Sequence, residues 1–263
     1  MIILFVGDVV GKPGRRAFKK LLPGLRASLG ASFVVVNGEN SAGGLGITRQ
    51  TGAELFDSGA DVITLGNHSF SKREAFDYVA QEPRLLRPAN YPSDVPGKGM
   101  GVYETANGCR IAVVSVLGRT FMEAVDCPFQ AADAALSEIA EATPVIVFDV
   151  HAEATSEKTS LAWHLDGRAS AVIGTHTHVQ TSDERVLPNG TAYITDVGMT
   201  GVVNSVLGLD CSSVIERFRT CVTHEFKLAE GTAALHAVSL DIDEATGRAR
   251  CVTRLVVSES VDS

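Results

Sequence analysis

The sequence lacks a disulfide framework, a long apolar run and an excess of basic charge. Its five cysteines are odd in number and include no Cys-x-x-Cys pair, a pattern typical of free thiols in a reducing cytoplasm. The apolar run Met1 to Val6 ends at Gly7-Asp8 and has no basic leader, so it predicts a buried strand rather than a signal peptide. No stretch reaches the roughly 18 consecutive apolar residues of a membrane span. A net charge of −8 argues against duplex nucleic acid or an anionic membrane as a partner.

These absences predict a cytoplasmic globular protein. Its 263 residues, 45% of them hydrophobic, can bury one substantial core. Neither an internal repeat nor a low-complexity tract divides the chain, so we predict a single domain over residues 1–263. A small anionic substrate stays open, because bound metal ions can supply local positive charge.

The first half of the chain alternates between short apolar runs and helix signals. The runs predict strands at residues 2–6, 33–36 and 62–65. Helix signals follow them near Pro13, which a first turn tolerates, near Thr48, and near Ser71, where Glu74 has the spacing of a capping box. The order strand, helix, strand, helix is typical of parallel strands.

The second half predicts a further set of strands. Residues 87–101 are rich in proline and glycine and are expected to form a loop over the surface or over the mouth of a site. The runs 101–104 and 109–114 resemble a hairpin around Asn107-Gly108. A helix is expected from Ala131 to Ala142, and strands return near Val145, Ala171, Ala192, Ala234 and Cys251. Alternation near the C-terminus indicates antiparallel strands. The sequence therefore predicts an α/β fold, a two-sheet β-sandwich flanked by helices.

Polar clusters stand at the ends of five predicted strands. Strand ends that meet at one edge of a sheet can assemble a polynuclear metal site from distant parts of a sequence. One such cluster is weak evidence, whereas five in the same context are specific. The clusters are Gly7-Asp8, Gly38-Glu39-Asn40, Gly66-Asn67-His68, His151 and Gly174-Thr175-His176-Thr177-His178.

The glycine-rich turn after the first strand has a competing interpretation as a phosphate-binding loop. A Walker loop needs four residues between its glycines, but only three separate Gly7 from Gly11, and Pro13 removes an amide that would contact phosphate. The dinucleotide fingerprint also fails, because Asp8 follows Gly7 and no glycine stands two residues after it. A metal ligand is the better interpretation of Asp8.

Other polar residues have a structural interpretation by default. A lone His151 would usually be structural, but its place among four other strand-end clusters reverses that expectation. Asp149 and Asp196 are expected to be turn or supporting residues, with the orientation of a ligating imidazole as the alternative. The remaining defaults are structural histidines at His164, His224 and His236, helix-start carboxylates at Glu153 and Glu157, and solvated helix faces rather than phosphate contacts for Lys12, Arg15, Arg16, Lys72 and Arg73.

The order of these clusters resembles the signature blocks of the calcineurin-like metallophosphoesterases. The finer pattern resembles the bacterial YmdB-type subgroup over essentially the whole chain. The residues that carry it are Asn37-Gly38-Glu39-Asn40, Leu65-Gly66-Asn67-His68, the segment from Arg87 to Pro92, and the segment from His151 to Lys158. The resemblance implies the two-sheet, helix-flanked architecture of that family.

The resemblance also implies a role for each cluster. Asp8 and His178 would hold one metal ion, Asn67, His151 and His176 the other, and Glu39 would bridge them. Val10 stands where the wider family has the histidine of Asp-x-His, and Asn40 is expected to take its place at the first ion. His68 would protonate the leaving alkoxide. Ser71 stands where the subgroup has an acidic residue.

The implied activity is a phosphodiesterase in which a hydroxide bridging two divalent ions attacks a 2′,3′-cyclic nucleotide in line. The mixed nitrogen and oxygen ligands favour Fe or Mn, with Zn or Co open. The alternatives are a phosphomonoesterase, a protein phosphatase, and a regulatory nucleotide-binding protein with little turnover. A homo-oligomer and the base preference are left open.

Overall fold

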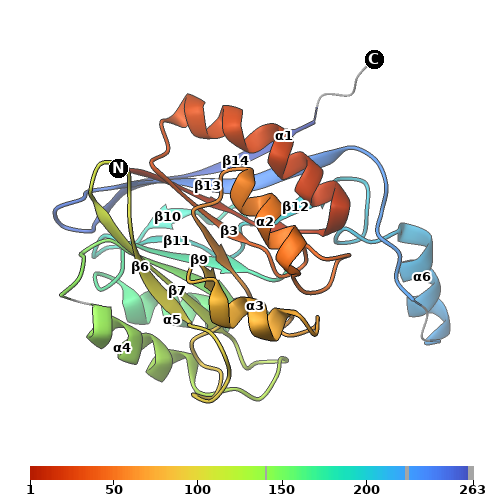
Figure 1. Cartoon of the computed structure of the whole chain (residues 1–263), viewed down its shortest axis with the longest axis horizontal. Coiled ribbons are helices and arrows are strands. Elements are labelled where there is room, and N and C mark those ends of the chain that lie inside the picture. Colours follow the sequence, from red (N-terminus) through yellow and green to blue (C-terminus); the bar gives the residue numbers. More distant parts are fainter. Residues whose placement is uncertain (140, 223–224, 260–263) are drawn as a thin grey trace.

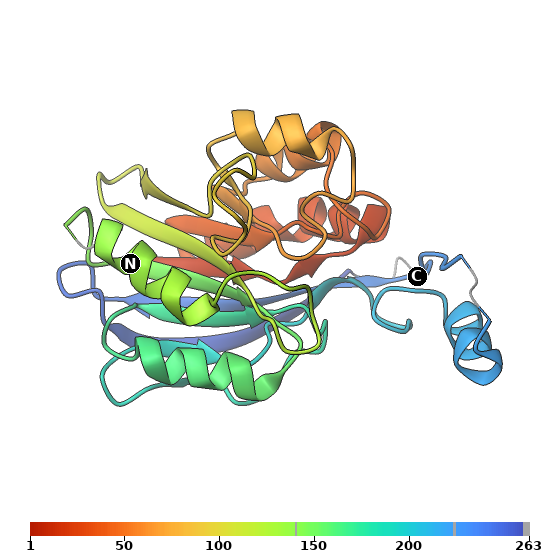
Figure 2. The same cartoon turned by 90° about the horizontal axis from the view of Figure 1, so that it is seen from below.

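The computed structural model describes residues 1–139, 141–222 and 225–259, in which two mixed β-sheets pack face to face between helices. The predicted α/β sandwich is therefore confirmed. Figures 1 and 2 show one group of helices outside each sheet and a further helix lying apart from the body. The structural interpretation of His224 concerns a residue outside the described ranges.

The first sheet joins the N-terminal strands to the C-terminal ones. Its order is β2-β12-β13-β1-β3-β4-β5, with β14 paired to β13. Strands β1, β3, β4 and β5 run parallel, whereas β13 is antiparallel to β1, β12 and β14, which confirms both expectations. The strands are β1 (Ile2–Val6), β2 (Asp8–Val9), β3 (Phe33–Asn37), β4 (Val62–Thr64), β5 (Leu85–Leu86), β12 (Met199–Val202), β13 (Ala233–Ile242) and β14 (Ala249–Ser258).

The second sheet is formed by the middle of the chain, in the order β10-β11-β9-β8-β7-β6. Strands β6 and β7 form the expected antiparallel hairpin, and Gly108 in its turn has a φ of +80°, which glycine adopts without strain. Strands β7, β8, β9 and β11 are parallel. The strands are β6 (Met100–Glu104), β7 (Arg110–Leu117), β8 (Ile146–His151), β9 (Ala171–Thr175), β10 (Arg185–Val186) and β11 (Ala192–Ile194).

Helices cover the outer face of each sheet. Helices α1 (Gly11–Leu29), α2 (Arg49–Asp57) and α3 (Ala75–Gln81) pack on the first sheet, and α4 (Pro128–Ile139) and α5 (Thr155–Leu165) on the second. Helix α6 (Cys211–Thr220) is the one that lies apart. Helix α2 starts after Thr48, as predicted, and the Thr48 side chain caps it in a complete capping box with Thr51, which the sequence analysis had expected only at the next helix.

Two helices, α3 and α4, differ from the prediction in their boundaries. Helix α3 begins at Ala75 rather than near Ser71, and Glu74 occupies its N-cap without a side-chain hydrogen bond. The reason is that the Ser71 amide donates to the His68 carbonyl in a turn that presents the Asn67-His68 pair. Helix α4 begins at Pro128, before the expected Ala131, because proline suits a first turn. The expected end at Ala142 was also wrong: α4 is described to Ile139, residue 140 lies outside the described residues, and the Ala142 amide donates to the Ile139 carbonyl in a turn.

The core explains why the strands read as continuous apolar runs. In β1, Ile3 and Phe5 pack between the two sheets, whereas Leu4 and Val6 pack beneath the helices of the first sheet. Successive side chains of a strand point to opposite faces, so a strand covered on both sides needs apolar residues throughout. The core between the sheets draws on both halves of the chain.

Candidate metal centre

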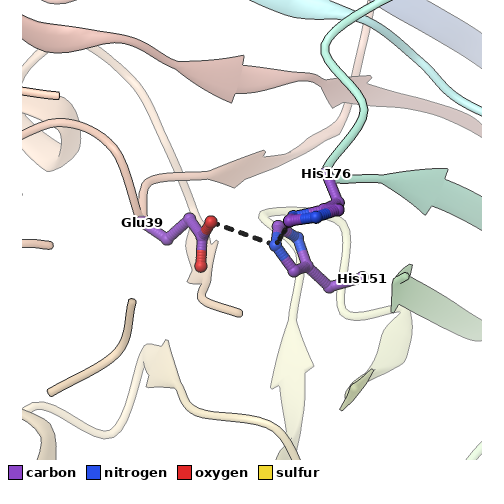
Figure 3. A group of neighbouring side chains, drawn as sticks. All are labelled: Glu39, His151 and His176. Atoms are coloured by element: carbon purple, nitrogen blue, oxygen red, sulfur yellow. Dashed lines mark hydrogen bonds and ion pairs between the residues drawn. The ribbon is translucent and has the colours of Figure 1, made fainter. Parts of the chain in front are cut away.

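Three of the predicted ligands form a tight group where strand ends of the two sheets meet. Glu39 follows β3, His151 ends β8 and His176 follows β9. One ligand atom from each lies within 4.8 Å of the others, and Figure 3 shows the three side chains pointing toward one another. The His151 Nε2 atom lies 3.0 Å from Glu39 Oε1 and 3.0 Å from His176 Nδ1.

Asn67 and His68 complete this side of the site. The Asn67 Oδ1 atom lies 3.1 Å from His151 Nε2, so the amide oxygen faces the same point as the two imidazoles. The His68 backbone amide donates to Glu39 Oε2 at 3.0 Å. The His68 side chain lines the adjacent pocket, with its Nε2 atom 3.5 Å from Asn67 Nδ2.

A second group lies beside the first. The Asp8 Oδ1 atom is 3.9 Å from His178 Nε2 and 3.9 Å from His151 Nδ1. The Asn40 amide nitrogen donates to the Gly44 carbonyl at 3.1 Å, which fixes the side chain with its oxygen buried. Neither Asp8 Oδ1 nor Asn40 Oδ1 has a hydrogen-bond partner among the described residues. Because a buried oxygen without a partner is costly, such a pair requires an explanation, and a bound cation supplies one.

The protonation of the site reflects its burial. Burial raises the pKa of Asp8 to about 6, although the imidazoles of His178 and His151 oppose the rise. Burial also lowers the pKa of His176 to about 3, and the charge of His151 lowers it further. For the pair Glu39 and His151, burial opposes both charges, but their mutual attraction lowers the pKa of the carboxylate and raises that of the imidazole.

A buried hydrogen-bond network orients His151 through its Nδ1 atom. The Asp149 carboxylate accepts from the Thr175 hydroxyl at 2.6 Å, and Thr175 Oγ1 in turn lies 2.9 Å from His151 Nδ1. Asp149 also accepts from Asn37 at 3.0 Å and from Thr64 at 2.5 Å, so it joins four strands of both sheets. Because the Thr175 hydroxyl donates its proton to Asp149, the Thr175 oxygen accepts a hydrogen bond from His151 Nδ1. This bond directs the other ring nitrogen, Nε2, toward the site. The geometry favours the orienting role for Asp149.

Asp196 supports the turn that carries His176 and His178. Its carboxylate accepts from the Thr177 amide at 3.0 Å and from the buried Lys158 ammonium at 2.8 Å. The support is needed because His176 and His178 have φ values of +93° and +64°, in the left-handed region that non-glycine residues rarely adopt. The sequence analysis missed Asn37, Thr64, Thr175 and Lys158. For Asn37, Thr64 and Thr175 the available signal was a polar residue in an otherwise apolar buried strand. Lys158 gave no such signal, because α5 contains several other polar residues.

Two glycines permit the close packing of the site. A Cβ on Gly66 would overlap the His151 ring, and one on Gly174 would overlap the Thr195 carbonyl. The glycines that precede Asn67 and Thr175 are therefore explained by space at these positions rather than by phosphate binding.

Some default interpretations were wrong. Glu153 lies two residues before α5 and does not belong to its first turn; its carboxylate lies 3.2 Å from His176 Nε2. Lys72 lies outside any helix and lines the site pocket. The physical reason is the same in both cases: α3 begins after Lys72, and α5 begins after Glu153, so neither residue lies in the helix in which it was expected.

Other default interpretations agree with the structure. Glu157 lies in the first turn of α5, and its carboxylate also accepts from the amides of Arg119 and Thr120. The ion pairs of Arg16 with Glu259 and of His164 with Asp133 agree as well. Arg15 differs, because its side chain is only 16% exposed and pairs with Glu54 instead of facing solvent.

A pocket of about 640 Å³ opens beside the cluster. Glu39, Asn40, His176 and His178 line its floor, with His68 beside them. The donor set of imidazole nitrogens, carboxylates and amide oxygens suits divalent transition metals, and the unpartnered Asp8 and Asn40 oxygens fit such an ion.

Removing the Asn40 side chain should weaken only one half of this centre. An amide oxygen is a neutral and weaker ligand than an imidazole, so partial chelation of the wild type should remove metal in two phases. In Asn40→Ala we expect the weaker phase to disappear while the ion near His151 and His176 is retained. Metal content measured by elemental analysis along a chelator titration tests this. A variant that keeps two equally tight ions would reduce Asn40 to a loop residue.

Comparisons with known proteins agree with this geometry. The profile of a family described as "YmdB-like protein" matches residues 4–255. A Bacillus subtilis (strain 168) protein named 2′,3′-cyclic-nucleotide 2′-phosphodiesterase is 50% identical over 259 residues, which cover 98% of each chain. A hypothetical protein from Thermus thermophilus superposes with a TM-score of 0.93 at 43% identity, covering 99% of this chain and all of its own. The crystal structure of a novel phosphatase from Mycoplasma pneumoniae gives a TM-score of 0.92 at 30% identity, with coverage of 100% and 95%.

The described residues contain no helix that is both long and apolar enough to cross a membrane.

Proposed function

Since the chain belongs to the YmdB-like family, we propose that it hydrolyses the cyclic phosphodiester of 2′,3′-cyclic ribonucleotides. The predicted family is thereby confirmed, and the chain is a hydrolase. The substrate is proposed from the name of the B. subtilis relative. The observation that carries the chemistry is the convergence of Glu39, His151 and His176 beside a pocket that also contains His68.

We place one divalent ion at Asp8, Asn40 and His178 and a second at Asn67, His151 and His176, with Glu39 shared between them. The unpartnered oxygens of Asp8 and Asn40 support the first position, and the three-residue group supports the second. When bound, two such ions supply positive charge to the phosphate and lower the pKa of water. Nitrogen ligands favour Fe or Mn over Mg, with Zn or Co as alternatives.

The residues of the chain divide the remaining work. A water releases a proton to the solvent as its oxygen forms a bond to phosphorus, and the bond between phosphorus and O2′ breaks. His68 delivers a proton to O2′ as that bond breaks, which leaves a nucleoside 3′-monophosphate. Glu39 holds the His68 backbone in place through its Oε2 atom. Glu153, at 3.2 Å from His176 Nε2, and Thr175, at 2.9 Å from His151 Nδ1, fix the orientation of the two imidazoles.

We also propose a cytoplasmic location. All five cysteines are free thiols, and three of them are exposed. Exposed thiols persist in a reducing compartment.

A substrate panel tests the proposed function. Protein purified without chelator should convert 2′,3′-cyclic AMP to adenosine 3′-monophosphate faster than it hydrolyses 3′,5′-cyclic AMP or bis(p-nitrophenyl) phosphate. Chromatography of the product identifies the broken bond. Faster turnover of p-nitrophenyl phosphate or of a phosphopeptide would instead assign a phosphomonoesterase or a protein phosphatase. Calorimetric binding of the cyclic nucleotide without turnover would assign a regulatory binding protein.

A further inference from the structure

The pocket beside the metal centre is lined by both polar and apolar residues. His68 and several of the proposed ligands are among the polar ones. The apolar lining residues, which we call the apolar wall, are Val10, Leu45, Leu207, Leu209 and Phe226. Three of these five residues come from the arm, which we define as residues 203–222 and 225–232 between β12 and β13. The arm includes α6, which lies apart from the body in both views (Figures 1 and 2).

The chemistry of the proposed reaction decides which part of the substrate faces this wall. The leaving O2′ belongs to the ribose, so the nucleoside remains on the side of the proton donor. His68 and the apolar wall line the same pocket. At about 640 Å³, this pocket has the size of typical small-molecule sites. A nucleobase attached to that ribose therefore lies against the arm.

The arm is fixed to the metal centre by Leu207. The Leu207 carbonyl oxygen lies 3.1 Å from His178 Nδ1, while the other nitrogen of that ring faces Asp8. Leu207 has a φ of +54°, which is strained for leucine, and its side chain is 45% exposed. Hydrogen bonds from Gly208 to Ser205 and from Ala229 to Gly208 hold this conformation. Strain combined with an exposed apolar side chain is typical of a binding element.

Phe226 contacts a cationic side chain of α6. The Arg217 guanidinium lies 4.8 Å from the centre of the Phe226 ring, and the ring is 39% exposed. The following Leu228 side chain packs directly against Gly11 and Gly44, where a Cβ would overlap it. An exposed aromatic ring that contacts a cation and lies two residues before an anchored leucine is a ready surface for stacking.

From this arrangement we propose that Leu207 and Phe226 form the nucleobase-binding wall of the substrate pocket. This inference rests on the proposed function. Contact through apolar surface and stacking is tolerant of base identity, because every base has a π-face. Purines cover more of such a wall than pyrimidines, so the enzyme accepts both and prefers purines.

A second exposed aromatic offers the strongest rival. Phe121 is 90% exposed and has a φ of +62°. It lines a separate pocket of about 280 Å³ with Asn67, Glu123 and His176. His68 does not line that pocket, so a base there would lie away from the proton donor. Phe121 therefore serves as a discriminating variant.

The test compares substrates with and without a base. For Phe226→Ala we expect the kcat/KM for 2′,3′-cyclic AMP to fall about 5- to 100-fold, mainly through KM, which is the worth of a base–aromatic stack. For Leu207→Ala we expect a smaller fall, also through KM, because that change removes apolar contact but no stack. The loss should be much smaller for 1-O-methylribose 2′,3′-cyclic phosphate, which has no base. The matched control is Phe218→Ala, because Phe218 is 81% exposed on α6 of the same arm and does not line the pocket. This control should keep the wild-type ratio between the two substrates.

The outcomes separate the wall from the proposed function. Equal losses of kcat/KM for both substrates in Phe226→Ala and Leu207→Ala would overturn the proposal. A lower ratio of kcat/KM for 2′,3′-cyclic AMP to kcat/KM for the base-free substrate in Phe121→Ala alone would also overturn it. A wild type without turnover of any 2′,3′-cyclic substrate would contradict the proposed function instead. In that case calorimetry with adenosine 3′-monophosphate still tests the wall. Weaker binding in both variants supports it, and unchanged binding overturns it.

Discussion

Replacing His68 with alanine is expected to lower turnover of 2′,3′-cyclic nucleotides by about 10²–10⁴-fold, the usual worth of a positioned general acid. Metal content should stay near that of the wild type, because Asn67, not His68, directs an oxygen at the His151 and His176 group. His68 contacts Glu39 through its backbone amide, which alanine retains. Turnover and elemental analysis of the same preparation give both readings.

The leaving group separates proton donation from other roles of His68. A nitrophenolate needs little protonation, so the His68→Ala loss should shrink for bis(p-nitrophenyl) phosphate. His164→Ala is a suitable control, because His164 pairs with Asp133 and does not line the pocket. Equal losses for good and poor leaving groups would argue against proton donation. A missing ion in His68→Ala would make this residue a ligand.

The architecture and the convergence of the predicted site could be read from short motifs. Each motif couples a buried strand to a polar residue at its end, and the pairing of parallel strands then brings these ends together. Asp8, Glu39 and Asn67 follow strands of the first sheet, and His151 and His176 stand at the ends of strands in the second. The short apolar runs indicated the strands, and the polar motifs indicated the edge at which the strand ends meet.

Residues that act through three-dimensional contact escaped the sequence analysis. Asp149 was recognised as a supporting residue, but its contacts with Asn37, Thr64 and Thr175 join strands that are distant in the sequence. The position of Glu153 beside His176 depends on where α5 begins. Helix starts are decided by competition among nearby caps and turns, which the local pattern resolves poorly.

The apolar wall was also invisible in the sequence. Leu207 and Phe226 lie in an arm without a strand-end motif, and their neighbours in the chain are not their neighbours in the pocket. Leucine and phenylalanine in a connecting segment usually indicate packing. Only their exposure beside His68 distinguishes a binding surface from a core contact.

Glu39→Ala is expected to remove both ions and to reduce activity to that of chelator-treated protein. The proposed role of Glu39 is shared between the two ions, so no other ligand can replace it on both sides. The same carboxylate lies 3.0 Å from His151 Nε2, and both side chains are almost fully buried. Alanine would also remove the negative charge that raises the pKa of this imidazole against its burial. Elemental analysis and thermal unfolding, each with and without chelator, separate metal loss from damage to the fold.

A matched pair of variants sharpens the Glu39 test. Glu39→Gln keeps the size of the side chain and one carbonyl oxygen but removes the charge, so it should retain part of the metal. Glu54→Ala removes a glutamate that pairs with Arg15 outside the pocket and should retain all of it. Chelator should lower the unfolding temperature of the wild type and of Glu54→Ala, but hardly that of Glu39→Ala, which has no ions to lose. If Glu39→Ala kept two ions and full activity, Glu39 would not be a shared ligand, because removal of a ligand that both ions share should weaken the binding of both.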